Sequence, residues 1–291
     1  MRLIAMPGNE DLAARLAAAV GARQCPLELR HFPDGESYVR LMEPVSGEQV
    51  CVVCTLDRPD QHFMGLAFVA AAAREAGATG VDLVAPYLAY MRQDRRFSEG
   101  EATSARAFAV LISTVFDSLL TIDPHLHRIR DLSEIFSIPA RALHAAPLLA
   151  DWISRNAPDA VVIGPDSESR QWVEAIARAA GVPFAVLSKT RHGDHEVSIV
   201  LPDLTLASGR RLILVDDIVS TGHTLLEAAG QLARAGFQTQ ACLAVHGLFA
   251  EGSYARLKSA FQAVVTTDSI VHASNGMSVV PLLAQALAER P

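Results

Sequence analysis

Two adjacent carboxylates precede a short polar turn in the segment "LILVDDIVSTGHTLL", residues 212–226. The aliphatic run predicts a buried strand that carries Asp216 and Asp217 to its solvent end. The turn offers hydroxyl and backbone N–H groups where a helix begins, an arrangement that binds a phosphate monoester. Its residues are Ser220, Thr221, Gly222, His223 and Thr224. Carboxylates repel a phosphate unless they hold a metal ion or sugar hydroxyls, so the segment predicts a site for a phosphorylated sugar.

The same segment permits a plainer interpretation. A helix capped by Ser220 or Thr221, with both aspartates solvated, needs no ligand. The spacing G-x-x-x-x-G-K-[ST] of a Walker nucleotide loop is absent from the segment. The double aspartate favours the sugar-phosphate site over the capped helix.

A second candidate for chemistry is the pair Lys189 and Arg191, two residues apart in the polar segment "SKTRHGDHE". If this segment is extended, the two cations lie on one face of it. Only Lys189 and Lys258 are lysines among the 25 basic residues. The presence of lysine at position 189 therefore indicates a need for a compact, mobile charge. A solvated hairpin rim and codon bias are the alternative explanations.

The elements that must position these residues alternate along the chain. Aliphatic runs predict strands at residues 2–6, 49–55, 80–87, 118–123, 160–166, 183–188, 211–217, 238–246 and 263–270. Helical periodicity predicts helices at residues 10–22, 64–77, 103–114, 169–181 and 223–236. This alternation indicates parallel sheets covered by helices, and ligands gather at the carboxyl ends of such strands.

The pattern of strands that end in polar, charged turns occurs twice. It predicts an N-terminal domain of residues 1–145 and a C-terminal domain of residues 146–291. The final helical segment, residues 279–290, can pack on either domain. Asp123 to His125 in "TIDPHLHR" and Asp166 in "IGPDSES" are expected in equivalent turns of the two halves.

Bulk composition narrows the class of protein. The 291 residues are 50% hydrophobic and 20% charged, which is enough apolar material for a folded core. A net charge of -7 without a basic tail argues against a nucleic-acid partner. The start "MRLIAMPGNE" does not resemble a signal peptide, and no apolar run could span a membrane, so a cytoplasmic protein is expected. Cys51 and Cys54 lie in a β-branched run and are expected in the core.

Five segments together resemble the ribose-phosphate pyrophosphokinase (PRPP synthetase) family. They occur in the family's order, and "RRFSEGE" and "DDIVSTG" are closest to its shorter, archaeal-type members. The segments are "HFPDGESYVRL", "PYLAYMRQDRRFSEGEATSAR", "TIDPHLHRI", "VLSKTRHGDHEV" and "LVDDIVSTGHT".

The resemblance implies a fold, a reaction and a shared site. The fold is α/β, with two tandem phosphoribosyltransferase type I-like domains, each a mainly parallel sheet flanked by helices. The reaction moves the diphosphoryl group of ATP to the anomeric hydroxyl of ribose 5-phosphate with Mg²⁺, giving 5-phosphoribosyl 1-pyrophosphate and AMP. The N-terminal domain is the ATP side and the C-terminal domain binds ribose 5-phosphate. An adenine site completed by a neighbouring subunit implies a homo-oligomer, at least a dimer.

The resemblance also assigns roles to particular residues. Lys189 and Arg191 are catalytic and stabilise the transition state when their loop closes over ATP. The implied ATP-binding residues are Phe32, Asp34, Glu36, Arg92, Gln93 and His125. His125 and Asp166 are implied in metal binding. Ribose 5-phosphate is assigned to Asp216 and Asp217, for the ribose hydroxyls, and to residues 220–224, for the phosphate.

Two positions depart from the family loop. Many members carry an aspartate where this chain has Ser220 and a small residue where it has His223. Independently of these departures, two other functions stay open. One is a type I phosphoribosyltransferase that uses PRPP, which would leave the N-terminal half without a task. The other is a catalytically silent regulatory homologue, although Lys189, Arg191 and His125 are all present.

Overall fold

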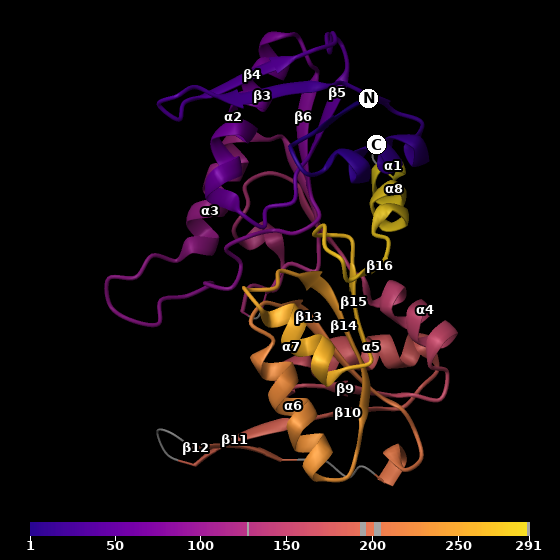
Figure 1. Cartoon of the computed structure of the whole chain (residues 1–291). Helices are drawn as coiled ribbons and strands as arrows, with labels where there is room; N and C mark the ends of the chain where they lie inside the picture. Colours follow the sequence, from indigo (N-terminus) through magenta and orange to yellow (C-terminus); the bar gives the residue numbers. More distant parts are fainter. Residues whose placement is uncertain (127, 193–195, 201–204, 290–291) are drawn as a thin grey trace. The chain divides into compact units, whose positions relative to one another are not determined.

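Figure 1 shows the computed structural model of the chain. The structure describes residues 1–126, 128–192, 196–200 and 205–289, with side chains in these ranges except those of residues 189–200. Two compact units are present. Unit 1 comprises Met1–Leu143, Ser269–Val271 and Val279–Pro291, and unit 2 comprises His144–Asp268 and His272–Ser278. The ranges predicted from the sequence differ from these units because two short C-terminal segments belong with unit 1.

Unit 1 is built on a six-stranded sheet in which all described pairs are parallel. The strands, in order across the sheet, are β2 (Arg23–Gln24), β1 (Arg2–Ala5), β5 (Gln49–Val53), β6 (Gly80–Ala85), β7 (Ser118–Ile122) and β8 (Ala140–Leu143). An antiparallel hairpin joins β3 (Leu27–His31) and β4 (Ser37–Leu41). The helices are α1 (Glu10–Val20), α2 (Pro59–Glu75), α3 (Ser104–Val115), α8 (Val280–Ala288) and the short 3₁₀ turn η1 (Leu132–Glu134).

Unit 2 has a second six-stranded sheet, whose described pairs are also all parallel. Its order is β10 (Phe184–Val186), β9 (Val161–Gly164), β13 (Leu212–Val219), β14 (Thr239–Gly247), β15 (Ala263–Thr267) and β16 (Asn275–Met277). The hairpin of β11 (Ser188–His192) and β12 (Glu196–Val200) projects from this sheet (Figure 1). The helices are α4 (Ala146–Asn156), α5 (Arg170–Ala180), α6 (His223–Arg234) and α7 (Ser253–Ala260), with 3₁₀ turns η2 (Ser167–Ser169) and η3 (Thr205–Ala207).

The two units repeat one topology. In each, the first strand lies second in the sheet, a hairpin follows the edge strand, and the remaining four strands extend the sheet in order. Hence β9 corresponds to β1, the β11–β12 hairpin to the β3–β4 hairpin, and β13 to β5. The prediction that the turns of His125 and Asp166 are equivalent is wrong. Asp166 lies in the turn after β9, and the equivalent turn of unit 1 follows β1. The turn after β7, which holds His125, corresponds to the turn after β15.

Local sequence explains where the helices begin and end. Pro59 starts α2, where the missing N–H of proline leaves no helical hydrogen bond unmade. Gly21 (φ 64°) and Gly181 (φ 70°) end α1 and α5 in the left-handed conformation that side chains disfavour. The final helix, α8, packs beside α1 (Figure 1) and buries Leu283 and Leu287.

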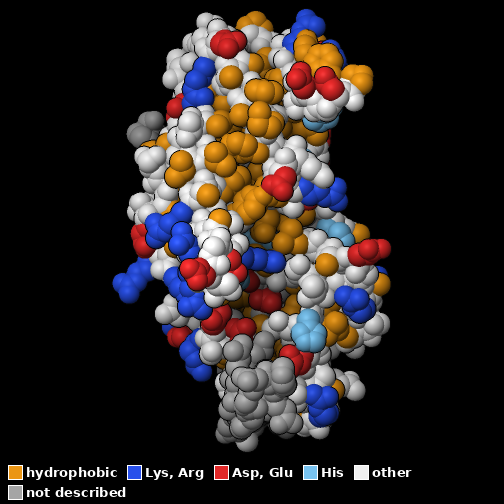
Figure 2. Space-filling view, turned by 90° about the vertical axis from the view of Figure 1, so that its left-hand side faces the viewer, with side chains coloured by type: hydrophobic (Ala, Val, Ile, Leu, Met, Phe, Trp, Pro, Cys, Tyr) orange, Lys and Arg blue, Asp and Glu red, His pale blue; other side chains and the backbone are white. Residues whose placement is uncertain are grey.

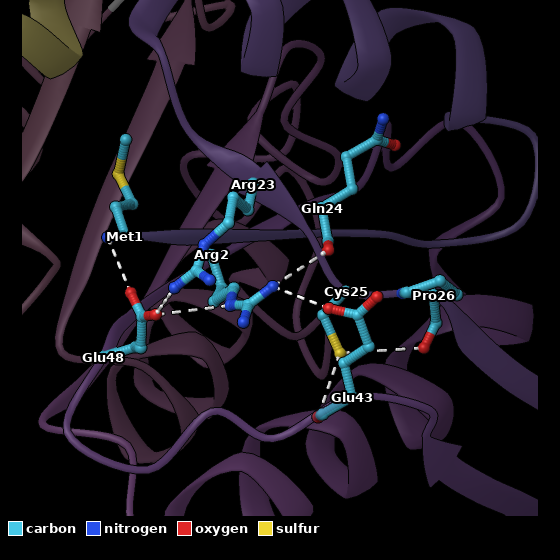
Figure 3. Close-up of polar contacts among 8 residues, drawn as sticks. All are labelled: Met1, Arg2, Arg23, Gln24, Cys25, Pro26, Glu43 and Glu48. Atoms are coloured by element: carbon cyan, nitrogen blue, oxygen red, sulfur yellow. Dashed lines mark hydrogen bonds and ion pairs between the residues drawn. The ribbon is translucent and has the colours of Figure 1, made fainter.

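A charged cluster holds the β1 edge of unit 1 (Figure 3). The Arg2 guanidinium is almost buried and donates to Glu43 at 2.7 Å and to the Gln24 carbonyl at 3.5 Å. Glu48 accepts from the amino group of Met1 at 2.9 Å and from Arg23. The pKa of Glu48 is lowered, first by the hydrogen bond from that amino group. The cluster joins β1 and β2 to the segment that precedes β5.

Large apolar side chains remain exposed on unit 1. Figure 2 shows apolar side chains gathered on the face turned to the viewer. On α2 and α3 the exposed ones are Met64, Phe68, Val110 and Leu111. Such a patch marks a contact surface more often than a bare monomer surface.

No described helix is long and apolar enough to cross a membrane. Cys51 and Cys54 are buried free thiols, as predicted.

Candidate active site

The acidic pair lies inside strand β13, which extends two residues beyond the predicted end of the strand. Asp216 pairs with Ala244 of β14, and pairing continues to Val219 and Gly247. Both carboxylates are half-buried. Asp216 Oδ1 accepts from the Asp217 N–H at 3.0 Å, and Asp217 Oδ1 accepts from the Ile218 N–H at 2.7 Å. Backbone donors therefore fix the orientation of both carboxylates near the carboxyl end of the strand.

The polar turn follows directly and opens helix α6. Gly222 is the N-cap, in the left-handed conformation at φ 71°, and no side chain caps the helix. The alternative of a helix capped by Ser220 or Thr221 is therefore wrong. Thr221 Oγ1 instead accepts a hydrogen bond from the backbone N–H of His223, the first residue of α6, at 3.4 Å. The first N–H groups of a helix have no intrahelical partner, so those at the start of α6 are suited to an anion.

Two other carboxylates of unit 2 act electrostatically on Asp216. Burial raises the pKa of Asp216 well above its usual range, and the charges of Asp217 and Asp166 raise it further. Asp166 is thus close enough to act electrostatically on the pair, although it follows β9 and not β13. This concentration of negative charge favours a cation or several hydroxyl donors.

Asp166 also has a structural task. Its Oδ1 accepts from the N–H groups of Glu168 at 3.1 Å and Ser169 at 3.2 Å, which caps η2. The turn is tight, because a Cβ on Gly164 would lie 2.4 Å from Ser169 Oγ. Within the described ranges, no three His, Cys, Asp or Glu side chains are grouped as metal ligands. A metal role for Asp166 and His125 therefore stays a prediction.

In unit 1, an ion pair between a buried carboxylate and an exposed guanidinium connects two of the predicted ATP segments. Asp94, whose side chain is 2% exposed, accepts from the Arg128 guanidinium at 2.9 Å and from the Arg128 N–H at 3.2 Å. Asp94 adjoins Arg92 and Gln93, whereas Arg128 follows His125 in the segment after β7. Sequence reasoning assigned no role to Asp94 or Arg128. The only available signal was an aspartate next to the two predicted residues.

The three predicted polar residues of these segments differ in exposure. Arg92 is exposed, whereas His125 is half-buried beyond the end of β7. Gln93 is held at the start of α3, where its Oε1 accepts from Ser104 Oγ at 3.2 Å and its carbonyl accepts from the Ala105 N–H at 3.2 Å. The Gln93 amide nitrogen and the Arg92 guanidinium are hydrogen-bond donors, and their role in ATP binding stays a prediction.

The segment "FPDGE" forms the tip of the β3–β4 hairpin. The Phe32 carbonyl accepts from the Gly35 N–H at 2.9 Å, and Asp34 Oδ1 accepts from the Glu36 N–H at 3.2 Å. Phe32 is 40% exposed. The Arg30 guanidinium lies 4.7 Å from the Phe32 ring centre. The turn is thus a regular proline–glycine turn that also presents an aromatic face and two carboxylates outward.

Comparison with known proteins decides the family. The family model for the N-terminal domain of ribose phosphate pyrophosphokinase matches residues 1–115, and the model for the phosphoribosyl transferase domain matches residues 131–281. The ribose-phosphate pyrophosphokinase of Methanothermobacter thermautotrophicus is 34% identical over 99% of this chain and 100% of its own. That of Methanopyrus kandleri is 36% identical over 99% of this chain and 98% of its own. The chain belongs to the ribose-phosphate pyrophosphokinase family.

The membership confirms the recognition and the fold expected from the sequence. The crystal structure of phosphoribosylpyrophosphate synthetase from Mycobacterium smegmatis matches with a TM-score of 0.86 and 27% identity, covering 99% of this chain and 97% of that one. The archaeal relatives agree with the resemblance to archaeal-type members. The two-unit α/β fold with parallel sheets is the fold that the resemblance implied.

The predicted catalytic pair of the family lies on the hairpin of unit 2. The backbone of Lys189 and Arg191 is extended in β11, opposite Ile199 and Val197 of β12. The two side chains lie outside the described part of the chain, so their catalytic role stays a prediction. The predicted residues therefore form two groups, with the ATP group in unit 1 and the acids, the turn and the cationic hairpin in unit 2.

Proposed function

We propose that this chain catalyses transfer of the diphosphoryl group of ATP to the anomeric hydroxyl of ribose 5-phosphate, giving 5-phosphoribosyl 1-pyrophosphate and AMP. The full-length match to ribose-phosphate pyrophosphokinases is the observation that carries the proposal. The local geometry of unit 2 supports it, because an acidic pair directly precedes a helix-opening turn.

Unit 2 supplies the acceptor side of the reaction. The N–H groups at the start of α6 and the hydroxyls of Ser220, Thr221 and Thr224 hold the 5-phosphate. Asp216 and Asp217 accept hydrogen bonds from the ribose hydroxyls, which explains why two carboxylates lie beside an anion site. His223 is exposed at the first position of α6 and borders the phosphate.

In the transfer step the anomeric oxygen attacks the β-phosphorus of ATP in line, and the bond to the departing AMP oxygen breaks. Negative charge then builds on the transferred group and on AMP, so catalysis is mainly positioning and cationic stabilisation. Lys189 and Arg191 supply that stabilisation from the β11–β12 hairpin. Closure of the hairpin over ATP excludes water, which would otherwise hydrolyse the nucleotide.

The residues of unit 1 bind ATP. Arg92 donates to the phosphates, the Gln93 amide donates to polar edges of the nucleotide, and His125 contacts the phosphates and the metal. The hairpin tip of Phe32, Asp34 and Glu36 reaches the adenine. The Asp94–Arg128 pair holds the segment of Arg92 and Gln93 beside the segment that follows His125.

The carboxylates of unit 2 fit a magnesium ion that arrives with the nucleotide. Mg²⁺ prefers hard oxygen ligands and keeps several waters, so one or two protein carboxylates suffice beside phosphate oxygens. Asp217 and Asp166 add to the effect of burial in raising the pKa of Asp216, and a cation bound beside these carboxylates would offset their charge. When bound, Mg²⁺ would offset the negative charge of the phosphates. Asp166 in unit 2 and His125 in unit 1 are each proposed as a metal ligand.

Product identification tests the activity. The protein is incubated with ATP, ribose 5-phosphate and Mg²⁺, and products are separated by anion-exchange chromatography and mass spectrometry. AMP and PRPP in equal amounts are expected, with no turnover when ribose 5-phosphate is omitted. Formation of ADP, or no turnover, would refute the proposal. A parallel reaction with PRPP and adenine or hypoxanthine tests the phosphoribosyltransferase alternative, and a catalytically silent homologue would fail in both.

A homo-oligomer acting in the cytoplasm completes the proposal. The exposed hairpin tip can reach an adenine site in a second copy, and the exposed apolar side chains of α2 and α3 offer a surface to cover. Light scattering after size-exclusion chromatography should give at least twice the monomer mass of 31.2 kDa. A monomer with full activity would contradict a site shared between subunits.

A further inference from the structure

The chain that follows β14 binds the back of the phosphate turn. We call residues 249–257 the supporting segment; it comprises a short loop and the first part of α7. The Phe249 N–H donates to the Val219 carbonyl at 3.0 Å and the Ala250 N–H donates to the Ser220 carbonyl at 2.9 Å. Arg256 Nη2 donates to the Thr221 carbonyl at 3.4 Å. Three successive carbonyls of the turn therefore point toward the supporting segment.

This pattern orients the other side of the turn. When the carbonyl oxygens are bound on one side, the peptide planes are fixed and their N–H groups face elsewhere. The Gly222 carbonyl is also occupied, by the Leu226 N–H at 3.0 Å. An anion site made of backbone N–H groups is effective only when they are aligned before the anion arrives. The supporting segment provides that alignment from outside the turn.

Packing reinforces the same contact. Gly222 is buried, and a Cβ at this position would lie 2.9 Å from Leu257 Cδ1. Leu257 itself is completely buried in the core beneath α6 and α7. The turn can approach α7 this closely only because residue 222 has no side chain. The supporting segment thus sets the position of the turn as well as its orientation.

An aromatic cluster holds the supporting segment in place. Phe249 has φ 39°, a conformation that a side chain disfavours. Its ring lies 4.3 Å from the His272 ring and 5.1 Å from the Tyr254 ring, centre to centre. The ring also covers the last residue of β14, because a Cβ on Gly247 would lie 2.6 Å from Phe249 Cε2. This packing offsets the strain of the Phe249 backbone. The strained conformation directs the Phe249 N–H toward the Val219 carbonyl.

His272 is fixed in turn by hydrogen bonds. Its ring Nδ1 lies 2.9 Å from Ser274 Oγ, and its backbone N–H donates to Asn275 Oδ1 at 2.8 Å. Burial lowers the pKa of His272, which favours the neutral form of the ring that packs on Phe249. The cluster of Phe249, Tyr254 and His272 is therefore a packed support with a defined orientation.

We propose that Phe249 and Arg256 are positioning residues for the 5-phosphate of ribose 5-phosphate. They act through the backbone of residues 219–221 and touch neither ATP nor the reacting atoms. The inference rests on the proposed function for the identity of the ligand. The phosphate lies far from the transferred group, so these residues contribute to ground state and transition state alike.

Two pairs of variants test this. Phe249→Ala removes the ring and Phe249→Tyr keeps it; Arg256→Met removes the donor and Arg256→Lys retains one. Lys258→Met is the control, since it removes an equal charge two residues along α7, where its Nζ lies 5.8 Å from the Tyr254 ring and does not contact the turn. Loss of one such contact weakens binding by about three- to tenfold.

Steady-state kinetics and direct binding give the readouts. Phe249→Ala and Arg256→Met should raise the KM for ribose 5-phosphate about three- to tenfold, with kcat and the KM for ATP within about twofold of wild type. Phe249→Tyr, Arg256→Lys and Lys258→Met should remain near wild type. Arg256 is exposed, so its variants should fold normally. Equal rises in both KM values, or an unchanged KM for ribose 5-phosphate in Arg256→Met, would overturn the inference.

Calorimetric titration with ribose 5-phosphate, without ATP, separates this inference from the proposed function. If wild type binds ribose 5-phosphate and Arg256→Met binds it more weakly, but no PRPP forms, the positioning role stands and the proposed reaction fails. If wild type makes PRPP and Arg256→Met binds ribose 5-phosphate as tightly as wild type, the reaction stands and the positioning role fails.

Discussion

Replacing Gly222 with alanine is expected to destabilise unit 2 by about 3 kcal/mol. The left-handed backbone at φ 71° costs a residue with a Cβ about 1–2 kcal/mol. The new methyl group would lie 2.9 Å from Leu257 Cδ1 and 3.1 Å from Leu257 Cγ, and overpacking of this kind costs about 1–3 kcal/mol. Alanine also restricts the unfolded chain, which returns about 0.4–1 kcal/mol.

Gly230 provides a matched control on the same helix. It lies in the interior of α6 with a negative φ, and a Cβ there would meet only Arg234 Nη1, at 3.8 Å. Alanine is the better helix former, so Gly230→Ala should stabilise unit 2 by about 0.5–1 kcal/mol. The same chemical change thus has opposite signs at two positions eight residues apart. Gly230→Ala should leave the KM for ribose 5-phosphate unchanged.

Urea denaturation followed by tryptophan fluorescence measures the effect in the right unit. Trp152 on α4 and Trp172 on α5 are the two tryptophans of the chain, and both lie in unit 2. A double-mutant cycle with Leu257→Ala separates the two costs, because the smaller side chain removes the clash but not the backbone strain. The expected coupling is about 1–3 kcal/mol in favour of the double variant. Unchanged stability of Gly222→Ala, or strict additivity with Leu257→Ala, would refute the reasoning.

Three further variants test other parts of the chain. Asp216→Asn should abolish ribose 5-phosphate binding but resist urea better than wild type. The pKa of Asp216 is raised in the folded state. The contribution of this carboxyl group to stability is therefore complete below its unfolded pKa of about 3.9 and is lost as pH rises through the folded pKa. The urea midpoints of variant and wild type should therefore diverge as pH rises above about 4, and parallel curves would contradict the pKa shift. Arg128→Ala leaves the buried carboxylate of Asp94 without its guanidinium, and should lower the free energy of unfolding by about 2 kcal/mol, against about 1 kcal/mol for Asp94→Asn, as measured by circular dichroism. Lys189→Ala should lower kcat by orders of magnitude with ATP binding little changed, and near-normal turnover would exclude its catalytic role.

Local patterns predicted much of the fold and the centre of the site. The aliphatic runs located nine of the twelve described strands of the two parallel sheets but not the edge strands β2, β8 and β16. The double aspartate with its polar turn indicated the candidate sugar-phosphate site, because this feature consists of consecutive residues. Helix α2 begins at Pro59, five residues before the predicted start, because proline is favoured at the first position of a helix. Strand β13 exceeds its predicted end because Ile218 and Val219 continue to pair with β14.

Contacts between distant residues could not be predicted in the same way. Asp94 and Arg128 are 34 residues apart, and no local pattern distinguishes their pair from any other two charges. The support of the phosphate turn depends on N–H groups of Phe249 and Ala250, which every residue except proline possesses. The N-cap at Gly222 escaped prediction because a buried close approach to Leu257, and not capping chemistry, selects the residue.

The placement of α8 has a consequence for biosynthesis. Unit 1 acquires Val279–Pro291 only after all of unit 2 has been translated, because unit 2 ends at Ser278. Thr55 Oγ1 then donates to the Ser269 carbonyl at 2.8 Å, and Glu289 pairs with Arg141 at 2.8 Å. A nascent chain on the ribosome can therefore complete the parallel sheet of unit 1 long before α8 covers α1. The half that is synthesised first is thus completed after the other, and its α1 surface stays open to chaperones until α8 has been synthesised.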